Sequence, residues 1–285
     1  PAPMRAAPQR DLHRHRRWPN LPAVSQTEIH PTAIVSAEAD LGAGCEIGPY
    51  CVIGAGVKLG EGCRLHGHVT VQGRAGIGAR NEFYPYASIG GRSQDLKYSG
   101  EPTYLEIGSD NTFREFVTIN RGTSPGDRTV IGSGCNFLAY SHVAHDCIVG
   151  DGVISSNNGT LAGHVEMGDH AILGGLTAVH QFCRVGRHAI TGGCSKIVQD
   201  VPPFMIADGN PAVVRGVNSV GLSRHGFPEE QIRTLKEAFK TIYLRKLNVA
   251  DAVTQLREKH AALPPEHPVN ELVEFIDASD RGIIR

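Results

Sequence analysis

Residues 41–65 of the chain read LGAGCEIGPYCVIGAGVKLGEGCRL, and a large apolar residue returns in this stretch at every sixth position. The residue that follows it is often glycine, and the residue four positions later is usually small. The pattern begins at Ile29 and continues without a slip to Ile89. A period of six suits neither an amphipathic helix nor a two-faced strand, but it is typical of a left-handed parallel β-helix with three six-residue sides per coil. We therefore predict an all-β left-handed parallel β-helix, a hexapeptide-repeat solenoid, in which residues eighteen apart lie on adjacent coils about 4.8 Å apart.

The repeat has two interruptions, residues 91–104 and 121–129, after which it resumes and runs to Ile197. Its weakest positions are Ser155 and Thr191, which are not apolar. We expect the interruptions to be loops that leave corners of the prism. Loops on a rigid scaffold often carry binding residues.

The 285 residues provide one solenoid and a smaller second domain. We interpret residues 1–28 as a basic, disordered extension, and the alternatives are a transit peptide or a basic anchoring arm. A secretory signal is not expected, because its apolar centre is missing. Residues 29–211 are expected to form the β-helix domain and residues 212–285 a C-terminal α-helical domain. The stretch 199–210, with its prolines and glycine, reads as a linker, and helical spacing of apolar residues begins near Pro228.

Composition excludes several classes of protein. The net charge of −1 gives no general reason to expect a nucleic-acid partner. No apolar run reaches the length of a membrane span, so we expect no stable membrane insertion. Six of the seven cysteines fall at the small inward position of the repeat, and without a CxxC pair they read as reduced apolar filler in a cytoplasmic protein. These six are Cys45, Cys51, Cys63, Cys135, Cys147 and Cys183.

Residues able to handle protons gather in one part of the repeat. With eighteen residues per coil, His145, Gly163 and Gln181 form one column, and Asp146 and His164 belong to the next column. Since Gly163 has no side chain, we expect a notch beside His145 with a backbone N–H at its wall. His145 and Asp146 could act as a base and its orienting partner.

The histidines leave other interpretations open. The histidines of this region could instead hold a metal, because a left-handed β-helix can assemble a three-histidine zinc site between subunits. Single histidines on a solenoid are usually surface residues, and we interpret His66, His68 and His170 in this way.

A second column consists of Asn157, Gly175 and Gly193. Two stacked glycines would open a groove suited to an extended acyl chain. The alternative is that both glycines only relieve crowding at a corner.

Several segments together carry a resemblance to a known family. They are HPTAI (30–34), QDLKY (94–98) with GEPT (100–103), VTI (117–119) with RGT (121–123), HVAHDC (142–147), LAGHV (161–165), AVHQFC (178–183), QDVPP (199–203) and GVN (216–218). From about residue 29 to the C-terminus, the chain closely resembles the acyl carrier protein–UDP-N-acetylglucosamine O-acyltransferases. The resemblance implies transfer of a 3-hydroxyacyl group from acyl carrier protein to the glucosamine 3-hydroxyl of UDP-N-acetylglucosamine, the first step of lipid A biosynthesis, without cofactor or metal.

The resemblance also implies roles for individual residues. His145 would be the general base, Asp146 would orient it, and the N–H of Gly163 would bind the oxyanion. Gly193 would limit the length of the acyl chain. The family is trimeric, and the implied substrate-binding residues are His142, His164, His180, Gln181, Asn218 and Arg224, with Asp95 and Lys97 reaching from a neighbouring subunit.

The chain departs from the commonest family pattern at Asn120, where histidine is frequent, and at Val220 and His225. Choice between a 3-hydroxy and a 3-amino sugar therefore stays open, and an N-acylating relative is one alternative. A zinc-dependent β-helix enzyme and a catalytically silent scaffold are the others. Basic residues that could receive the acidic carrier protein, unless they belong to an ordinary mixed-charge surface, are Arg92, Arg121, Arg184, Arg187, Lys196 and Arg215.

Overall fold

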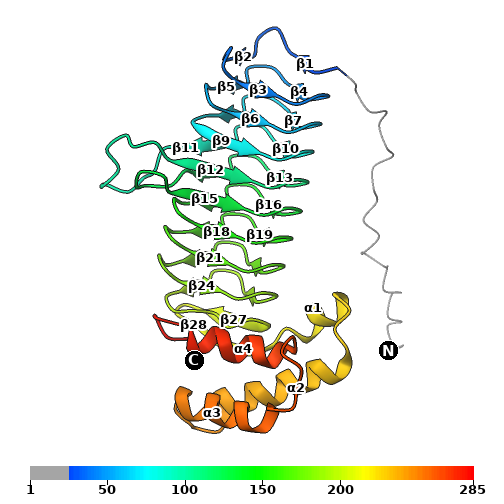
Figure 1. The fold of residues 1–285 in the computed structure, drawn as a ribbon, viewed down its shortest axis with the longest axis vertical. Coiled ribbons are helices and arrows are strands. Elements are labelled where there is room, and N and C mark those ends of the chain that lie inside the picture. Colours follow the sequence, from blue (N-terminus) through cyan, green and yellow to red (C-terminus); the bar gives the residue numbers. More distant parts are fainter. Residues whose placement is uncertain (1–25) are drawn as a thin grey trace, which may run out of the picture.

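The computed structural model describes residues 26–285, so the expected extension over residues 1–28 lies almost entirely outside the described residues. The rest of the chain winds into a left-handed parallel β-helix, with helices packed at its C-terminal end (Figure 1). The predicted fold class is therefore confirmed.

Three sheets form the faces of the prism, and their strands pair in parallel except for β27 with β28. The first sheet contains β1 (Glu28–Ile29), β4 (Glu46–Ile47), β7 (Arg64–Leu65), β10 (Glu82–Phe83), β13 (Thr112–Phe113), β16 (Asn136–Phe137), β19 (Ile154–Ser155), β22 (Ile172–Leu173), β25 (Ile190–Thr191), β27 (Met205–Gly209) and β28 (Ala212–Val217). The second contains β2 (Ile34–Val35), β5 (Val52–Ile53), β8 (Thr70–Val71), β11 (Ser88–Gly91), β14 (Thr118–Asn120), β17 (His142–Val143), β20 (Thr160–Leu161), β23 (Ala178–Val179) and β26 (Lys196–Ile197). The third contains β3 (Asp40–Leu41), β6 (Lys58–Leu59), β9 (Arg74–Ile77), β12 (Tyr104–Ile107), β15 (Arg128–Ile131), β18 (Ile148–Val149), β21 (Glu166–Met167) and β24 (Arg184–Val185).

The register follows the predicted spacing of eighteen residues per coil. Ile47 lies opposite Leu65, a separation of 65 − 47 = 18 residues. The separation is 113 − 83 = 30 between Phe83 and Phe113, and 137 − 113 = 24 between Phe113 and Phe137. The two interruptions therefore add 12 and 6 residues to their coils, and both leave the prism on the same side (Figure 1).

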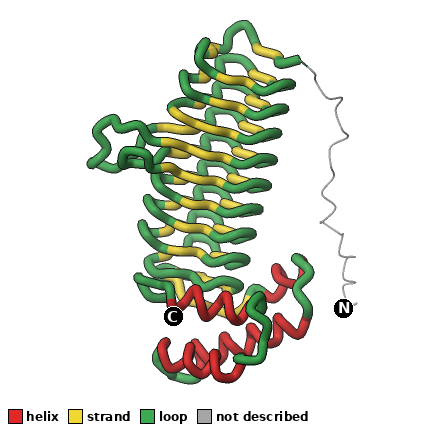
Figure 2. Tube along the Cα trace, viewed as in Figure 1, coloured by secondary structure: helices red, strands yellow, loops and turns green. Residues whose placement is uncertain are grey.

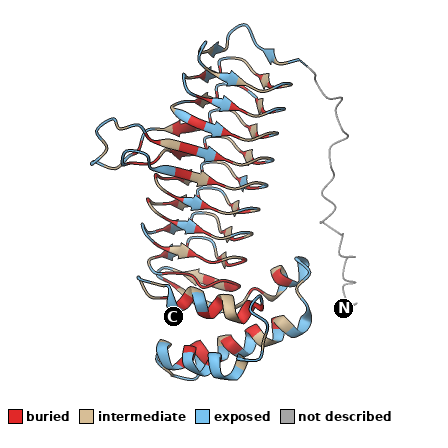
Figure 3. Cartoon of the chain, in the orientation of Figure 1, coloured by how far each residue is buried: buried red, intermediate tan, exposed pale blue. Residues whose placement is uncertain are grey.

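The repeated apolar residues fill the inside of the prism (Figure 3). Phe83, Phe113 and Phe137 stack directly above one another, with ring centroids 4.9 and 5.2 Å apart. The two weak repeat positions are also inside, with Ser155 only 3% and Thr191 only 2% exposed. A polar side chain is tolerated there when it finds a partner, and the hydroxyl of Thr191 accepts a hydrogen bond from the Gly174 N–H (2.8 Å).

At its corners the chain turns sharply through left-handed backbone conformations. Many corner residues are not glycine, and examples are Tyr50 (φ 58°), His68 (φ 52°), Asp146 (φ 60°) and His164 (φ 59°). A residue with a Cβ atom adopts this conformation at a cost of about 1–2 kcal/mol. The coil hydrogen bonds on both sides hold these residues in place. The corner between the second and third sheets is called the loop corner below, that between the third and first the helix corner, and that between the first and second the aromatic corner.

The C-terminal part is helical, as expected (Figure 2). It consists of α1 (Ser219–Arg224), α2 (Glu229–Phe239), the π-helical turn η1 (Lys240–Leu244), α3 (Val249–His260) and α4 (Pro268–Asp277). Their apolar faces form a second core cluster that includes Phe204, Leu222 and Leu235. Among the helices of residues 26–285, none is long and apolar enough to cross a membrane.

The junction of the two parts differs from expectation. The linker interpretation of residues 199–210 is wrong for β27, which extends the first sheet by pairing with β25 and then pairs antiparallel with β28. Prolines at 202 and 203 suggested an irregular stretch, but they lie before the strand and leave its N–H groups free to pair. The expected boundary between residues 211 and 212 falls inside this hairpin, and the first helix starts only at Ser219.

Candidate functional site

The centre of the candidate site is His145, at the loop corner between β17 and β18. It is only 9% exposed. Its Nδ1 lies 2.8 Å from Asp146 Oδ2 and 2.9 Å from Thr123 Oγ1. Because an ionised carboxylate can only accept hydrogen bonds, Nδ1 is the donor, and in the neutral imidazole the lone pair is then on Nε2. This is the tautomer that a general base needs.

The carboxylate of Asp146 is held firmly. Its Oδ1 accepts a hydrogen bond from the Thr123 N–H (3.1 Å), and its own N–H donates to Thr129 Oγ1 (2.9 Å). The side chain is only 7% exposed. The pairing of His145 with Asp146, expected from sequence, is therefore present in the structure.

Gly163 provides the predicted notch beside the imidazole. A Cβ atom at this glycine would lie 2.4 Å from Cε1 and 2.6 Å from Nε2 of His145. Within residues 26–285, the N–H of Gly163 donates to no protein acceptor. A free N–H next to a basic nitrogen, in a space that no side chain fills, is an arrangement suited to an oxyanion.

Two more histidines surround this centre. His164 meets the His145 ring edge-on (centroids 5.3 Å apart, 88°), stacks on Phe182 (4.6 Å), and places Nε2 3.6 Å from Asp146 Oδ2. His142 Nδ1 lies 2.7 Å from Thr118 Oγ1, and burial, with a smaller effect of His145, lowers the pKa of His142. His142 is therefore neutral at pH 7.

A hollow of about 310 Å³ lies beside these groups. It is lined by Gly126, Asp127, Arg128, Asp146 and His164. Pockets for small ligands start at about this size.

The first projecting loop is tied by hydrogen bonds to His145 of its own chain. Ser93 Oγ lies 2.7 Å from Thr123 Oγ1, which contacts His145, and Ser93 also accepts the N–H of Asp95 (3.1 Å). Asp95 Oδ1 in turn accepts the N–H of Lys97 (2.8 Å). Within one chain this loop is therefore connected to His145, and the implied reach of Asp95 and Lys97 into a neighbouring subunit's site stays a prediction.

Sequence reasoning missed Ser93 and Thr123, the two hydroxyl residues of this connection. Each lies at the start of an interruption, where the six-residue period no longer predicts position. The one available signal was their position in the motifs that carry the family resemblance: Ser93 directly precedes QDLKY, and Thr123 is the last residue of RGT.

Other predicted site residues lie elsewhere on the single chain. Asn218 is at the helix corner, where its amide donates to the His188 carbonyl oxygen (2.9 Å) and its Oδ1 accepts the Gly221 N–H (3.1 Å). Arg224 is exposed in the last turn of α1. One chain therefore does not bring Asn218 and Arg224 to His145.

Two predicted residues at the loop corner are solvent-exposed, His180 and Gln181. Their side chains are not engaged in the His145 network. His180 Nδ1 instead lies 3.1 Å from the backbone oxygen of Gln181.

The glycines of the predicted groove lie at the aromatic corner. A Cβ at Gly175 would approach no atom closer than the Asn157 oxygen at 3.4 Å, and a Cβ at Gly193 would meet only the Gly175 oxygen, also at 3.4 Å. The space outside both glycines is therefore open. An acyl groove at this position stays a prediction.

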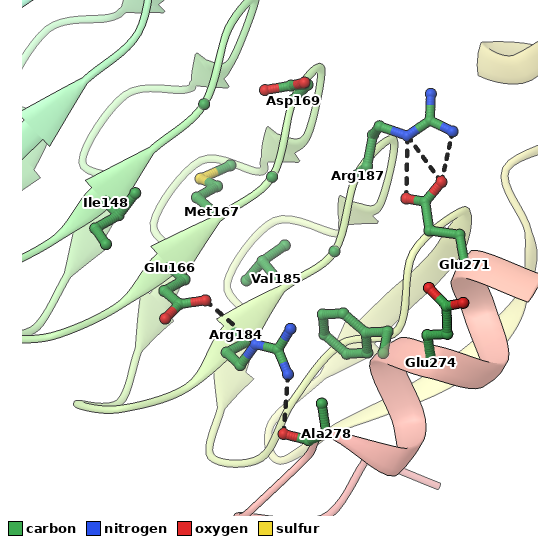
Figure 4. Close-up of a pocket in the computed structure, with 14 residues that line it drawn as sticks. Ile148, Glu166, Met167, Asp169, Arg184, Val185, Arg187, Glu271, Glu274 and Ala278 are labelled. Carbon is green, nitrogen blue, oxygen red and sulfur yellow. Dashed lines mark hydrogen bonds and ion pairs between the residues drawn. The ribbon is translucent and has the colours of Figure 1, made fainter. Parts of the chain in front are cut away.

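A larger hollow, of about 560 Å³, lies between the third sheet and α4, and His145 is not among the residues that line it (Figure 4). Arg184 pairs with Glu166 (3.3 Å) and lies over the Phe275 ring, while Arg187 pairs with Glu271 (2.6 Å). These contacts fasten α4 to the β-helix. Both guanidinium groups have partners within the chain, and a role for Arg184 and Arg187 in receiving a carrier protein stays a prediction.

The metal interpretation of the loop corner is also weakened by the hydrogen bonds. Ligand atoms of His145, Asp146 and His164 all lie within 4.8 Å of one another. However, Nδ1 of His145 and both carboxylate oxygens of Asp146 are already hydrogen-bonded. A metal bound at Nδ1 of His145 or at the carboxylate of Asp146 would compete with these contacts.

Comparison with known proteins gives consistent matches. The family model described as "Udp N-acetylglucosamine O-acyltransferase; Domain 2" matches residues 200–284, and the model "Bacterial transferase hexapeptide (six repeats)" matches residues 38–73. The acyl-[acyl-carrier-protein]–UDP-N-acetylglucosamine O-acyltransferase of Burkholderia orbicola is 51% identical over 261 residues, covering 91% of this chain and 100% of that protein.

Solved structures agree with these sequence matches. LpxA from Acinetobacter baumannii is 43% identical and superposes with a TM-score of 0.85, covering 90% of this chain and 99% of that one. The UDP-N-acetylglucosamine acyltransferase of Francisella novicida is 36% identical, with a TM-score of 0.86 over 90% of this chain and 94% of that one.

Proposed function

Because this chain belongs to the acyl-[acyl-carrier-protein]–UDP-N-acetylglucosamine O-acyltransferase family, it is an O-acyltransferase of the first step of lipid A biosynthesis, and we propose that His145 is its general base. We propose further that the donor is a 3-hydroxyacyl group on acyl carrier protein and the acceptor the glucosamine 3-hydroxyl of UDP-N-acetylglucosamine. One observation carries the proposal: Nδ1 of His145 is held by Asp146, while Nε2 faces Gly163, whose N–H is free.

The reaction follows from these groups. A sugar hydroxyl is a weak nucleophile, so Nε2 of His145 removes its proton while the oxygen attacks the thioester carbonyl. A C–O bond forms, and the negative charge on the former carbonyl oxygen is stabilised by the N–H of Gly163. The C–S bond then breaks, the electron pair leaves on the carrier's sulfur, and the imidazolium returns its proton to that thiolate.

Asp146 and Thr123 have supporting roles. The carboxylate of Asp146 stabilises the imidazolium that forms during attack and fixes its orientation. Thr123 connects the base to Ser93 and so to the loop that carries Asp95 and Lys97. The loop is proposed to contact the nucleotide sugar close to the base, together with His142, His164, His180 and Gln181.

The complete site is proposed to require a homotrimer. The base is at the loop corner, Asn218 and Arg224 at the helix corner, and Gly175 and Gly193 at the aromatic corner, and three corners of one prism cannot meet. Packing prisms around a threefold axis would bring corners of neighbouring subunits together. The aromatic corner also exposes large apolar side chains suited to burial: Tyr50 (58%), Tyr86 (50%), Phe116 (41%), Tyr140 (55%) and Leu176 (62%).

The buried cysteines support a cytoplasmic location, which we also propose. Six cysteines with free thiols are buried in the described residues, as is usual where thiols are kept reduced.

The general-base role is tested by His145→Ala. The purified enzyme is assayed with a ladder of 3-hydroxyacyl carrier proteins and UDP-N-acetylglucosamine, and products are identified by mass spectrometry. General-base catalysis contributes about 10²–10⁴-fold, so we expect kcat to fall by at least about 100-fold while the circular dichroism spectrum is unchanged. His66→Ala, which removes another histidine on the β-helix surface, is the matched control. A His145→Ala enzyme with more than about a tenth of the wild-type rate would exclude this role.

A further inference from the structure

A second group of histidines lies at the helix corner, away from His145. Ligand atoms of His170, His188 and His225 all lie within 4.8 Å of one another. The rings of His170 and His188 stack with centroids 4.9 Å apart, and the His225 ring is 4.7 Å from each. The interpretation of His170 as a single surface histidine is therefore wrong, because it is one of a trio.

The trio joins the two parts of the chain. His170 and His188 are eighteen residues apart and occupy the same left-handed corner position (φ 56° and 54°) on successive coils. His225 ends α1, where its backbone N–H caps the helix. On the inner side, the His188 ring packs edge-on against Phe227 (5.1 Å), which closes one wall.

The ring nitrogens of the trio are free. Among the hydrogen bonds of residues 26–285, none involves the side chain of any of the three, so six nitrogens lack a protein partner. His188 is only 3% exposed, and burial lowers its pKa to about 3. Burial also lowers the pKa of His225. Each ring therefore has an unpaired nitrogen that can offer a lone pair when the imidazole is neutral, which is the form that binds metal.

We propose that His170, His188 and His225 form a binding site for a divalent transition-metal ion such as Zn²⁺, with water as a fourth ligand. Imidazole nitrogens suit zinc, copper and nickel. Zn–N bonds of about 2.0–2.1 Å in tetrahedral geometry separate the ligand nitrogens by about 3.4 Å, so the rings must close by about an ångström or more. His170 and His225 have solvent on one side and can rotate to do so, while the buried His188 provides the fixed ligand.

The bound ion would fasten α1 to the end of the β-helix. At present Asn218 makes such a link, through its hydrogen bond to the His188 backbone. An ion held by one histidine of α1 and two of the prism would stabilise the same junction, and unfolding would then depend on metal concentration.

The site is tested by titrating full-length, tag-free, EDTA-stripped protein with ZnCl₂ in a calorimeter and with CoCl₂ by visible absorption. We expect one ion per chain and a tetrahedral Co²⁺ spectrum. His170→Asn should weaken Zn²⁺ binding by at least about 10–100-fold, since loss of a ligand costs no less than loss of a group supporting one. The matched control His68→Asn changes a histidine in the same corner conformation (φ 52°), stacked between tyrosines, and should bind like wild type.

Two further variants keep the result unambiguous. His225→Gln alters an exposed residue whose capping bond is made by backbone, so it should fold normally and also lose Zn²⁺ affinity. His164→Asn disrupts the other histidine group and should leave binding unchanged. The proposal is overturned by a wild-type protein that binds no better than His225→Gln, or by binding that His164→Asn abolishes and His170→Asn retains.

Discussion

The replacement Gly163→Ala should displace the His145 ring without removing any group to which we assign a chemical role. The alanine keeps the backbone N–H that we assign to the oxyanion, and it keeps His145 and Asp146. It adds one methyl group, whose carbon would lie 2.4 Å from Cε1 and 2.6 Å from Nε2 of His145. Ordinary contact begins near 3.4 Å, so the ring must move by about 1 Å.

The size of the effect follows from what the movement disrupts. His145 Nδ1 is held at 2.8 Å by Asp146 and at 2.9 Å by Thr123, so a shifted ring lengthens both hydrogen bonds. A displacement of 1 Å in a catalytic group can cost about 100-fold in rate. We expect kcat of Gly163→Ala to fall by about 100-fold, with KM for the nucleotide sugar little changed, because the contacts that bind substrate are not altered.

Steady-state acyl transfer over a range of UDP-N-acetylglucosamine concentrations gives kcat and KM separately. Gly76→Ala is the matched control, because a Cβ at Gly76, in β9, meets nothing within 4 Å. Gly76→Ala should have wild-type kinetics. If Gly163→Ala kept more than about a tenth of wild-type kcat, the notch would have no part in catalysis, and the assigned position of the base would be wrong.

Four other outcomes are expected. Gly193→Met should shift preference to shorter acyl donors, since its side chain would enter the open space at the aromatic corner; an unchanged product ladder in mass spectrometry removes the groove. Thr123→Val should lower kcat by up to about 10-fold at constant KM, because it removes one hydrogen bond that contributes about 0.5–1.5 kcal/mol. A rate equal to that of the wild type would contradict the positioning role of Thr123. In the native protein a thiol reagent at pH 8 should modify Cys194 alone, because the other six cysteines are buried. All seven cysteines should react in denaturant. A second cysteine that reacts rapidly in the native protein would show that the prism opens. His267 caps α4 by accepting the Val269 N–H, and burial lowers the pKa of His267. The unfolded state therefore binds the proton more readily than the folded state does. The free energy of unfolding should fall as pH drops below about 6.5, by at most about 1.4 kcal/mol per pH unit. Urea midpoints at pH 7.5 and 5.5 should differ less for His267→Asn than for wild type, and an equal difference would contradict this.

The β-helix and the centre of the candidate site, His145 with Asp146 and Gly163, could be predicted because the fold converts sequence spacing into position. Once six residues make one side, eighteen residues separate neighbours on adjacent coils, and His145 must lie next to Gly163. Asp146 follows His145 and needs no long-range information. The same rule predicts that His164 and Phe182 stack, as they do.

Contacts outside the repeat could not be predicted in this way. Ser93 and Thr123 belong to loops whose paths are set by local hydrogen bonds and not by the period. His225 reaches His188 only after the hairpin and α1 have folded back on the last coil, and no spacing in the sequence encodes that contact. Pro202 and Pro203 concealed β27 because they usually interrupt strands, although here they precede one.

The coil of three six-residue sides limits how such a chain can change in length. An insertion or deletion of six residues preserves which side chains face inward but moves everything beyond it to the next face. Only a change of eighteen residues leaves every downstream column where it was, displaced by one coil. The prism can therefore lengthen only in whole coils of about 4.8 Å, while the two projecting loops are free to vary.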